Sequence, residues 1–251
     1  MQSSGKVYLI GAGPGDPDLL TVKALRVLRA ADVVLYDRLV SPEVLALADP
    51  GAAFLYAGKH AGEQEPVQQW IVEQMVAHAR RGCTVARLKG GDPCVFGRAG
   101  EEWQALRAEG IEVELVPGIS SAVAVAGLAG IPVTFRGLSR AFAVVTGHCQ
   151  DPAETEWSRY AAVDTLVILM GVKHRAAIAG ELIRAGRPPE EPAAFIERGT
   201  TAEERVVTAT LGEIAAGGIQ VEAPAVFVVG RVVALRRELT AEALLSAWVP
   251  A

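Results

Sequence analysis

The stretch KVYLIGAGPGDP, residues 6–17, is the most informative about the fold of this 251-residue chain. Its first five residues have the largely apolar character of a buried strand, and the glycines and prolines after them predict a tight turn. A helix is expected over residues 20–30, where Val22, Leu25 and Leu28 recur on one face. A strand that passes through a tight turn into a helix is the repeating unit of a parallel α/β sheet.

The same alternation of strands and helices continues to about residue 116. Further strands are expected at 33–36, 53–56, 84–88 and 112–116, and further helices from Pro66 onward and over 99–108. Such alternation predicts a parallel sheet covered by helices on both faces. The segment Pro117-Gly118-Ile119-Ser120-Ser121 interrupts it. We therefore expect an N-terminal α/β domain over 1–117, which carries the glycine loops, and a C-terminal α/β domain over 118–251.

The second half of the chain repeats the alternation less regularly. Strands are expected at 141–146, 165–169, 193–196, 205–208 and 225–229, with a helix over 173–185. No long crossover helix separates the last two strands, so a mixed sheet is expected here. The predicted fold class is therefore α/β, with a mainly parallel N-terminal sheet and a mixed C-terminal sheet. A ligand cleft is expected between the two domains, because domain interfaces commonly bind ligands.

Composition narrows the class of protein. Hydrophobic residues make up 51% and charged residues 21%, as in ordinary globular proteins, and the net charge of −5 argues against a nucleic-acid surface. The most apolar stretch, 122–133, contains two glycines and a proline and is shorter than the roughly 20 residues of a membrane span. The three cysteines lack C-x-x-C spacing, and no signal-peptide pattern begins the chain. The sequence predicts a cytoplasmic protein with no metal, no nucleic acid and no membrane partner.

The glycine-rich turn at 11–17 resembles a dinucleotide fingerprint but departs from it. Asp16 occupies the position of the third glycine of G-x-G-x-x-G, and Pro14 removes an amide donor. A loop with two prolines and an acid suits a cationic or neutral ligand better than a pyrophosphate. A tight turn without any ligand stays open as the alternative, since glycine and proline dominate turns.

Two further small-residue turns follow predicted strands. LKGGDP at 88–93 comes after the fourth strand, and ligands of α/β sheets bind at that carboxyl edge, so both glycine loops are expected to face one crevice. Glu101 and Glu102 open the next helix, where we interpret them as acids that suit its dipole. Ser120 and Ser121 precede another helix and predict either a carboxylate-binding turn or a simple helix cap.

Asp37 and Lys59 are the candidates for proton transfer. Asp37 follows the second predicted strand and Lys59 the third, and catalytic groups commonly lie on such loops. In a dinucleotide-binding protein Asp37 would instead hold a ribose. Exposed strand-end residues without a role stay open as the third interpretation.

These motifs, in this order and spacing, resemble the uroporphyrinogen-III C-methyltransferases of the tetrapyrrole methyltransferase family. The motifs are GAGPGDP at 11–17, LYDRLV at 35–40, GKHAG at 58–62, LKGGDP at 88–93, FGR at 96–98, VPGISSA at 116–122 and GIPVT at 130–134. The resemblance covers essentially residues 6 to 235. It implies methylation of two pyrrole carbons of uroporphyrinogen III by S-adenosyl-L-methionine, which gives precorrin-2 for sirohaem or cobalamin synthesis, and a homodimer.

The resemblance also implies the residues of the site. Asp37 stands at the position of the family's proton acceptor and Lys59 at that of its proton donor. The cofactor-binding positions are Pro14, Gly90, Gly91, Asp92, Val95, Ser120, Ser121, Met170, Gly199 and Ala225. A basic wall for the substrate's carboxylates is expected from Arg38, Lys59, His60, Arg98 and Arg136.

The chain departs from the family pattern at two positions, and two rival functions stay open. Cys94 stands where an aromatic residue is usual, and His60 where a basic residue is common. An NAD-type oxidoreductase would use the first glycine loop and Asp37 but would leave the second loop unexplained. A catalytically silent regulator that binds S-adenosylmethionine would need the loops but neither Asp37 nor Lys59.

Overall fold

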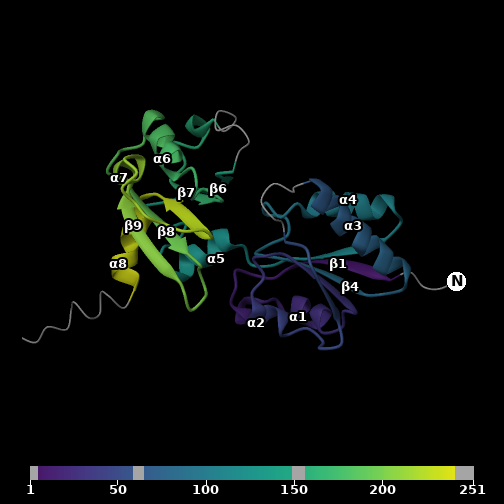
Figure 1. Cartoon of the computed structure of the whole chain (residues 1–251). Coiled ribbons are helices and arrows are strands. Elements are labelled where there is room, and N and C mark those ends of the chain that lie inside the picture. The colour runs from purple at the N-terminus through teal and green to yellow at the C-terminus, as the bar shows by residue number, and fades with distance from the viewer. Residues whose placement is uncertain (1–4, 59–64, 149–155, 241–251) are drawn as a thin grey trace, which may run out of the picture. The chain divides into compact units, whose positions relative to one another are not determined.

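The structure is a computed structural model that describes residues 5–58, 65–148 and 156–240 (Figure 1). The chain forms two compact units, Met1–Ser120 and Ser121–Ala251. The described residues of each unit form one five-stranded sheet. That segments 1–117 and 118–251 are the two domains of the chain stays a prediction.

The sheet of the first unit is entirely parallel. Its strands are β1 (Lys6–Gly11), β2 (Val33–Tyr36), β3 (Ala53–Tyr56), β4 (Val85–Lys89) and β5 (Glu112–Val116). Their order is β3-β2-β4-β1-β5, so β1 lies between β4 and β5. Gly11 is paired with Lys89 and Ile10 with Val116, which brings the carboxyl ends of these three strands level at one edge. The predicted parallel sheet is confirmed.

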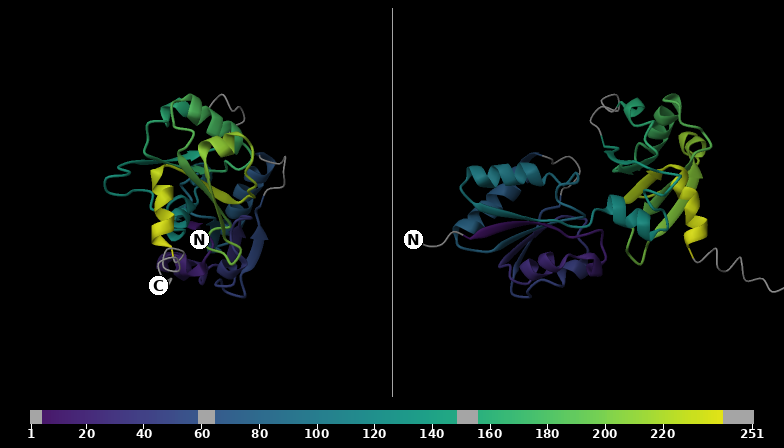
Figure 2. Two further views of the ribbon diagram at one scale, coloured as in Figure 1. Left: turned by 90° about the vertical axis from the view of Figure 1, so that its left-hand side faces the viewer. Right: turned by 180° about the vertical axis from the view of Figure 1, so that it is seen from behind.

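Helices cover both faces of this sheet (Figures 1 and 2). They are α1 (Val22–Leu28), α2 (Pro42–Leu45), α3 (Glu65–Arg80) and α4 (Ala99–Ala108). Ile71, Met75 and Leu106 of α3 and α4 pack on one face, and α1 and α2 pack on the other. Because successive strand residues point to opposite faces, Val85, Arg87 and Lys89 of β4 share one side. Val85 lies in the core with α3 and α4, so this is their side.

The apolar stripe predicted for the first helix is wrong in one position. Val22 is 72% exposed, whereas Ala24 and Leu28 are fully buried. Thr21 caps the helix by accepting a hydrogen bond from the Ala24 backbone, so the helix begins at Val22. The buried face is the one that contains Ala24 and Leu28, four residues apart, and Val22 lies off it.

The sheet of the second unit is mixed, as the sequence predicts. Its strands are β6 (Phe142–Thr146), β7 (Thr165–Leu169), β8 (Pro192–Glu197), β9 (Arg205–Thr210) and β10 (Ala225–Val229). The order is β6-β7-β10-β8-β9. The neighbours β6 and β7 are parallel, and the other three neighbouring pairs are antiparallel. Phe195 of β8 and Phe227 of β10 are paired across strands and stack with their ring centroids 4.2 Å apart.

Helices also cover both faces of the second sheet. They are α5 (Ser121–Leu128), α6 (Arg175–Arg184), α7 (Leu211–Ala215) and α8 (Arg236–Leu239). Helices α6 and α7 pack over one face, while α5 and the 3-10 turn η4 (Arg231–Leu235) pack over the other. No helix within the described ranges has both the length and the apolar character needed to cross a bilayer.

Candidate functional site

Three loops of the first unit meet at the carboxyl edge of its sheet. The backbone N–H of Gly13 donates to the Gly91 carbonyl at 3.2 Å, and the N–H of Gly91 donates to the Gly13 carbonyl at 2.7 Å. The Ala12 N–H donates to the Lys89 carbonyl at 2.8 Å. The two glycine loops that the sequence singled out are therefore bonded to one another. Their predicted position on one sheet edge is confirmed.

Gly11 and Gly118 are glycines because three backbones approach closely here. A Cβ atom on Gly11 would lie 2.5 Å from the Gly118 Cα atom and 2.6 Å from the Gly91 carbonyl oxygen. A Cβ atom on Gly118 would collide with that same oxygen. The turn that contains Gly118 therefore contacts both glycine loops through its backbone. The sequence motifs alone do not reveal this contact.

Two aspartates of these loops hold the loop backbone. Asp92 accepts a hydrogen bond from the Cys94 N–H at 2.8 Å and another from the Gly118 N–H at 3.1 Å, so its carboxylate joins the second loop to the third. Asp16 accepts from the Asp18 N–H at 2.9 Å and caps the 3-10 turn η1 (Pro17–Leu19). The sequence interpretation placed these acids only relative to a ligand. The structure gives each of them a local structural role as well.

Asp37 lies directly beside the second glycine loop. Its backbone N–H donates to the Leu88 carbonyl at 3.3 Å, and its side chain is 30% exposed. Oδ1 of Asp37 is 2.7 Å from Nη2 of Arg87, and Oδ2 is 3.9 Å from Nζ of Lys89. A partly exposed carboxylate is thus held by two cations at the edge where the three loops meet.

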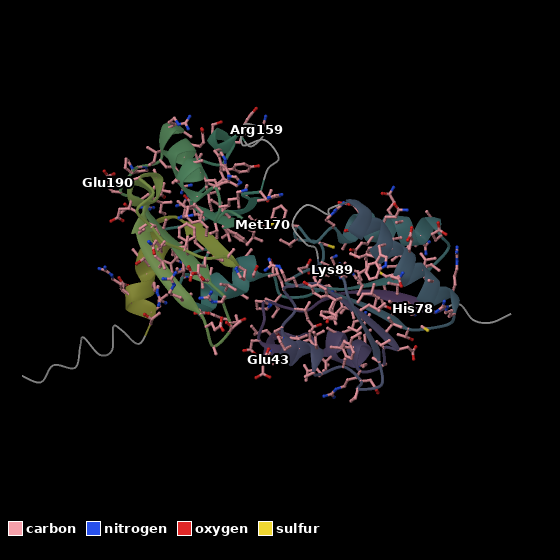
Figure 3. All side chains as sticks on the ribbon, viewed as in Figure 1. Glu43, His78, Lys89, Arg159, Met170 and Glu190 are labelled. Carbon is pink, nitrogen blue, oxygen red and sulfur yellow. The ribbon has the colours of Figure 1, made fainter. Side chains whose placement is uncertain are left out.

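Behind Asp37 is a buried charge cluster, formed by Arg87, Lys89 and Glu102, with the neutral, half-buried Gln68 as a hydrogen-bond partner. The side chains of Arg87 and Glu102 are 2% and 0% exposed, and Lys89 is also buried (labelled in Figure 3). Oε1 of Glu102 lies 2.7 Å from Lys89 Nζ, 2.9 Å from Gln68 Nε2 and 3.3 Å from Arg87 Nη2. This arrangement corrects the interpretation of Glu102 as a helix-end acid.

Glu102 points inward because of its place on α4. It lies one turn before Leu106, which is fully buried, so both residues are on the helix face that packs against the sheet. Sequence reasoning did not select Arg87 at all. Arg87 could have been recognised from the sequence, because it lies within the predicted strand 84–88. A charged side chain in a buried strand must have hydrogen-bonding or oppositely charged partners.

The buried cluster shifts the pKa values of its members. Burial by itself disfavours the charged form of Glu102, but the cations of Arg87 and Lys89 outweigh it and lower the pKa of this carboxyl. Burial, together with the nearby Arg87 cation, lowers the pKa of Lys89 despite its acidic partners. Burial also opposes the charge on Arg87, yet Asp37 and Glu102 raise its pKa. Glu102 is therefore an anion at neutral pH.

The predicted site residues of the second unit gather at one edge of its sheet. Met170 follows β7 and Gly199 follows β8, while Ala225 begins β10, which is antiparallel to both strands. Ser121 begins α5, and a Cβ atom on Gly199 would collide with Val125 of that helix. These four residues are therefore supported by neighbouring elements of this unit. Whether they contact a cofactor stays a prediction.

Left-handed backbone conformations mark the same loops. Among the described residues other than glycine, positive φ angles occur at Phe96, Arg98, Met170, Arg198 and Thr200. Each is either a predicted cofactor residue or lies within three residues of one. Such conformations are unfavourable for residues with a Cβ atom and concentrate at functional sites. They are an observation, independent of the motifs, that points to these loops.

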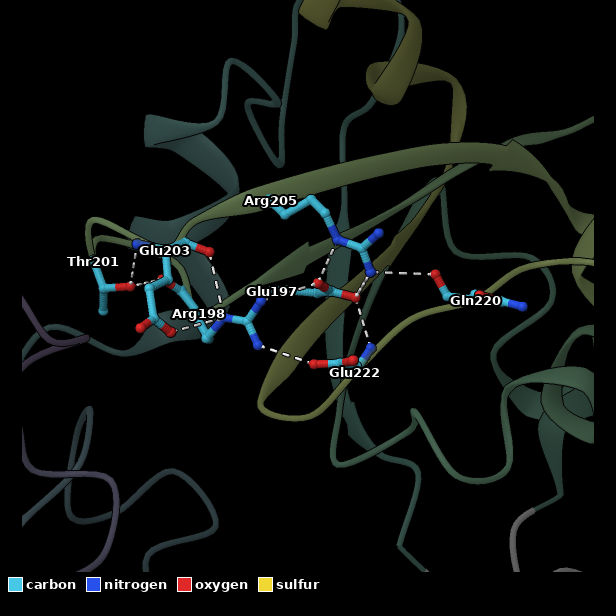
Figure 4. A network of polar contacts seen from close by, with 7 residues as sticks. All are labelled: Glu197, Arg198, Thr201, Glu203, Arg205, Gln220 and Glu222. Carbon is cyan, nitrogen blue, oxygen red and sulfur yellow. Dashed lines mark hydrogen bonds and ion pairs between the residues drawn. The ribbon is translucent and has the colours of Figure 1, made fainter.

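A polar network holds the turn that contains Gly199 (Figure 4). Glu197, fully buried, accepts two hydrogen bonds from Arg205, both at 2.7 Å, and one from the Glu222 N–H at 2.6 Å. Arg198 donates to the Glu222 carboxylate at 3.2 Å, and Thr201 donates to the Arg198 carbonyl at 2.7 Å. The bonds from Arg205 lower the pKa of Glu197. The network supports Arg198 and Thr200 in their left-handed conformations.

The other predicted residues are placed as follows. Lys59 and His60 lie outside the described residues. Pro14, Gly90, Val95 and Ser120 are half-buried on the first unit's loops, and Arg38 and Arg136 are exposed. Arg98 donates to Glu101 at 2.8 Å on the surface. Within the described ranges no three His, Cys, Asp or Glu side chains are grouped as a metal site requires.

Comparison with known proteins gives consistent matches. The model of the family Tetrapyrrole (Corrin/Porphyrin) Methylases matches residues 6–215. The uroporphyrinogen-III C-methyltransferase of Priestia megaterium is 47% identical over 234 residues, which cover 91% of this chain and 98% of that protein. The siroheme synthase of Stutzerimonas stutzeri is 48% identical over 239 residues, which cover 94% of this chain and 51% of that protein. The chain thus spans about half the length of the siroheme synthases it matches.

A solved structure matches the chain closely as well. It is that of the uroporphyrin-III C-methyltransferase from Thermus thermophilus complexed with S-adenosyl homocysteine. The two chains are 48% identical and superpose with a TM-score of 0.81, and the match covers 91% of this chain and 93% of that one.

Proposed function

The chain belongs to the tetrapyrrole (corrin/porphyrin) methylases, and from this premise we propose that it transfers methyl groups from S-adenosylmethionine to two pyrrole carbons of uroporphyrinogen III. The product is precorrin-2, which leads to sirohaem, cobalamin or both. The proposal rests on one observation above others: Asp37 and both glycine loops share a sheet edge, in a chain 47% identical to a uroporphyrinogen-III C-methyltransferase.

The loops at this edge fit a cationic cofactor better than a dinucleotide. A pyrophosphate needs free backbone N–H groups, but the N–H groups of Ala12, Gly13 and Gly91 donate to carbonyls of the loops themselves. The carboxylate of Asp92 lies at the same edge, and a positively charged ligand is attracted by it. This argues for S-adenosylmethionine and against the NAD-type oxidoreductase.

We assign the cofactor site to loops of both units. The residues are Pro14, Gly90, Gly91, Asp92, Val95, Ser120, Ser121, Met170, Gly199 and Ala225. When bound, the sulfonium of S-adenosylmethionine supplies an activated methyl group. The chain's contribution is then to orient both reactants, and good orientation is worth about 7–11 kcal/mol of the barrier at best.

Asp37 is the proposed proton acceptor. After a pyrrole carbon gains a methyl group the macrocycle is cationic and must lose a proton, which a carboxylate can accept. Oδ1 of Asp37 is oriented by Arg87, while the side chain keeps part of its surface open.

Lys59 is proposed as the proton donor. The basic wall for the substrate's carboxylates is proposed to consist of Arg38, Lys59, His60, Arg98 and Arg136. We further propose that the protein acts in the cytoplasm.

Methyl transfer tests this function directly. The full chain is incubated with methyl-labelled S-adenosylmethionine and uroporphyrinogen III under anaerobic conditions. Label in a red dimethylated product supports the proposal. Binding of the cofactor without any transfer would support the silent regulator, and hydride transfer with a nicotinamide cofactor would support the oxidoreductase.

A further inference from the structure

The buried charge cluster contains more charge than the proposed reaction uses. Two cations, Arg87 and Lys89, project from the same face of β4, and two carboxylates, Asp37 and Glu102, approach them from different elements. Asp37 is partly exposed, whereas Glu102 is fully buried. The role of Glu102 must therefore be exerted through other side chains.

The distances show how the positive charge is shared. Nη2 of Arg87 contacts Asp37 at 2.7 Å and Glu102 at 3.3 Å, so one nitrogen bridges the two carboxylates. Lys89 is 2.7 Å from Glu102 but 3.9 Å from Asp37. Glu102 therefore engages most of the Lys89 charge and part of the Arg87 charge. Asp37 is left with one close ion pair.

The cluster is not a fully satisfied structural salt bridge. Within the described part of the chain, Nε of Arg87 and Oε2 of Glu102 are buried without a hydrogen-bond partner. Buried ion pairs are seldom the most stable choice for a core, and well-packed apolar residues often replace them without loss. This favours a purpose other than stability for the three buried charges beside Asp37.

We propose that Glu102 is a positioning residue that acts on Asp37 through Arg87 and Lys89. The inference rests on the proposed function, in which Asp37 accepts the proton. Glu102 pairs with both cations and so keeps them beside Asp37. Because the two cations share their charge with Glu102, they do not both pair fully with the carboxylate of Asp37. If the charge of Glu102 were lost, Asp37 would be the only counter-ion to both cations. A carboxylate paired in that way is a poorer proton acceptor.

A double-mutant cycle between Glu102 and Asp37 tests this inference. Single-turnover methyl transfer is measured at saturating S-adenosylmethionine for the wild type, Glu102→Gln, Asp37→Asn and the double variant. We expect Glu102→Gln to lower the rate about 10-fold in the wild-type background, below the ~10²–10⁴-fold typical of removing a general base. In the Asp37→Asn background the same change should alter the rate less than about twofold, because coupled residues are not additive.

Glu109→Gln is the matched control, since Glu109 caps the end of the same helix and pairs with Arg80 on the surface. Its rate should stay within about twofold of the wild type. If Glu102→Gln does not fold, Glu102→Asp keeps the charge at a shorter reach and is carried through the same cycle. About a threefold loss is then expected in the wild-type background only.

The outcomes separate this inference from the proposed function. Equal losses in both backgrounds would show that Glu102 has only a structural role, and an unchanged rate for Glu102→Gln would show no role in turnover. Either result overturns the inference and leaves the methyltransferase intact. A wild-type protein that transfers no methyl group would overturn both.

Discussion

At the scale of single residues, Asp37 is the position at which a role in the reaction can be distinguished from a role in cofactor binding. Its carboxylate is held at 2.7 Å by Arg87 but is not buried, which suits a group that must exchange a proton with a bound molecule. A ribose ligand would need the same residue for hydrogen bonding alone. The two roles predict different effects on turnover when the carboxylate is replaced by a neutral group of the same shape.

Asp37→Asn is expected to lower single-turnover methyl transfer by about 10²–10⁴-fold while leaving S-adenosylmethionine affinity nearly unchanged. The amide keeps the shape of the carboxylate but cannot accept the proton. The measurement is transfer at saturating cofactor beside a calorimetric titration, with the exposed Glu43→Gln as control. Normal turnover with weakened binding would instead favour the ribose role.

Gly118→Ala should disturb the cofactor loops without unfolding the protein. The added Cβ atom collides with the Gly91 carbonyl oxygen, so one of the two loops must move. We expect S-adenosylmethionine affinity to fall at least about 10-fold by calorimetry, a loss that corresponds to about 1.4 kcal/mol. Gly100→Ala is the control, because a Cβ atom there meets nothing within 4 Å and helix propensity favours alanine. Unchanged binding by Gly118→Ala would contradict the proposed site.

At the scale of elements, β4 and α4 form one electrostatic unit, and the turn after β8 forms another. In the first, α4 supplies an anion to cations on the strand beneath it. In the second, Glu197 and Arg205 join β8 to β9 and hold a left-handed turn. Each arrangement leads to a separate prediction.

Glu102 should make stability depend on pH. Because its pKa is lowered below the ordinary value of 4.5, the ionised form stabilises the folded state above that pH, and this contribution is lost as the pH falls through the folded-state pKa. Denaturant unfolding should show Glu102→Gln about 3–5 kcal/mol less stable than the wild type at pH 7. The difference should shrink at pH 4 and below. A difference that does not change with pH would contradict the ionised state assigned to Glu102.

Glu197→Gln should loosen the turn at 198–200. The amide cannot keep both hydrogen bonds from Arg205, so the left-handed conformations lose their support. If Gly199 contacts the cofactor, affinity for S-adenosylmethionine should fall about 10-fold while the saturated rate changes little. Exposed Glu190→Gln provides the comparison. An affinity equal to that of the wild type would remove Gly199 from the proposed site.

At the scale of the whole molecule, the proposed site draws residues from both units. Pro14, Asp37 and Asp92 belong to the first unit, and Met170 and Gly199 to the second. Each unit presents its residues at one edge of its own sheet. The full chain is therefore the right material for every binding experiment described above.

We propose that the protein is a homodimer, on the ground of its family resemblance. Sedimentation velocity at micromolar concentration should give a mass twice that of the single chain. Dilution to nanomolar concentration in the same experiment checks whether the dimer dissociates. A single-chain mass at micromolar concentration would end this proposal.

Most strands, the longer helices and the position of the glycine loops could be predicted from the sequence, whereas the short helices α2, α7 and α8 were not. Strands β2, β3, β5, β7 and β10 and helix α4 begin and end where the hydrophobic pattern predicts. Both sheets have the expected parallel and mixed character. These features are local, because side-chain periodicity and the conformations of glycine and proline act over a few residues.

Which of these residues meet depends on the tertiary structure. Gly11, Gly91 and Gly118 contact one another because β1 lies between β4 and β5, and Asp37 meets Arg87 because β2 is next to β4. Strand order depends on the packing of the whole unit, and a local pattern does not contain it. For the same reason the interpretation of Glu102 as a helix-end acid is wrong: its residue type predicts exposure, and only the cations of β4 make its burial favourable.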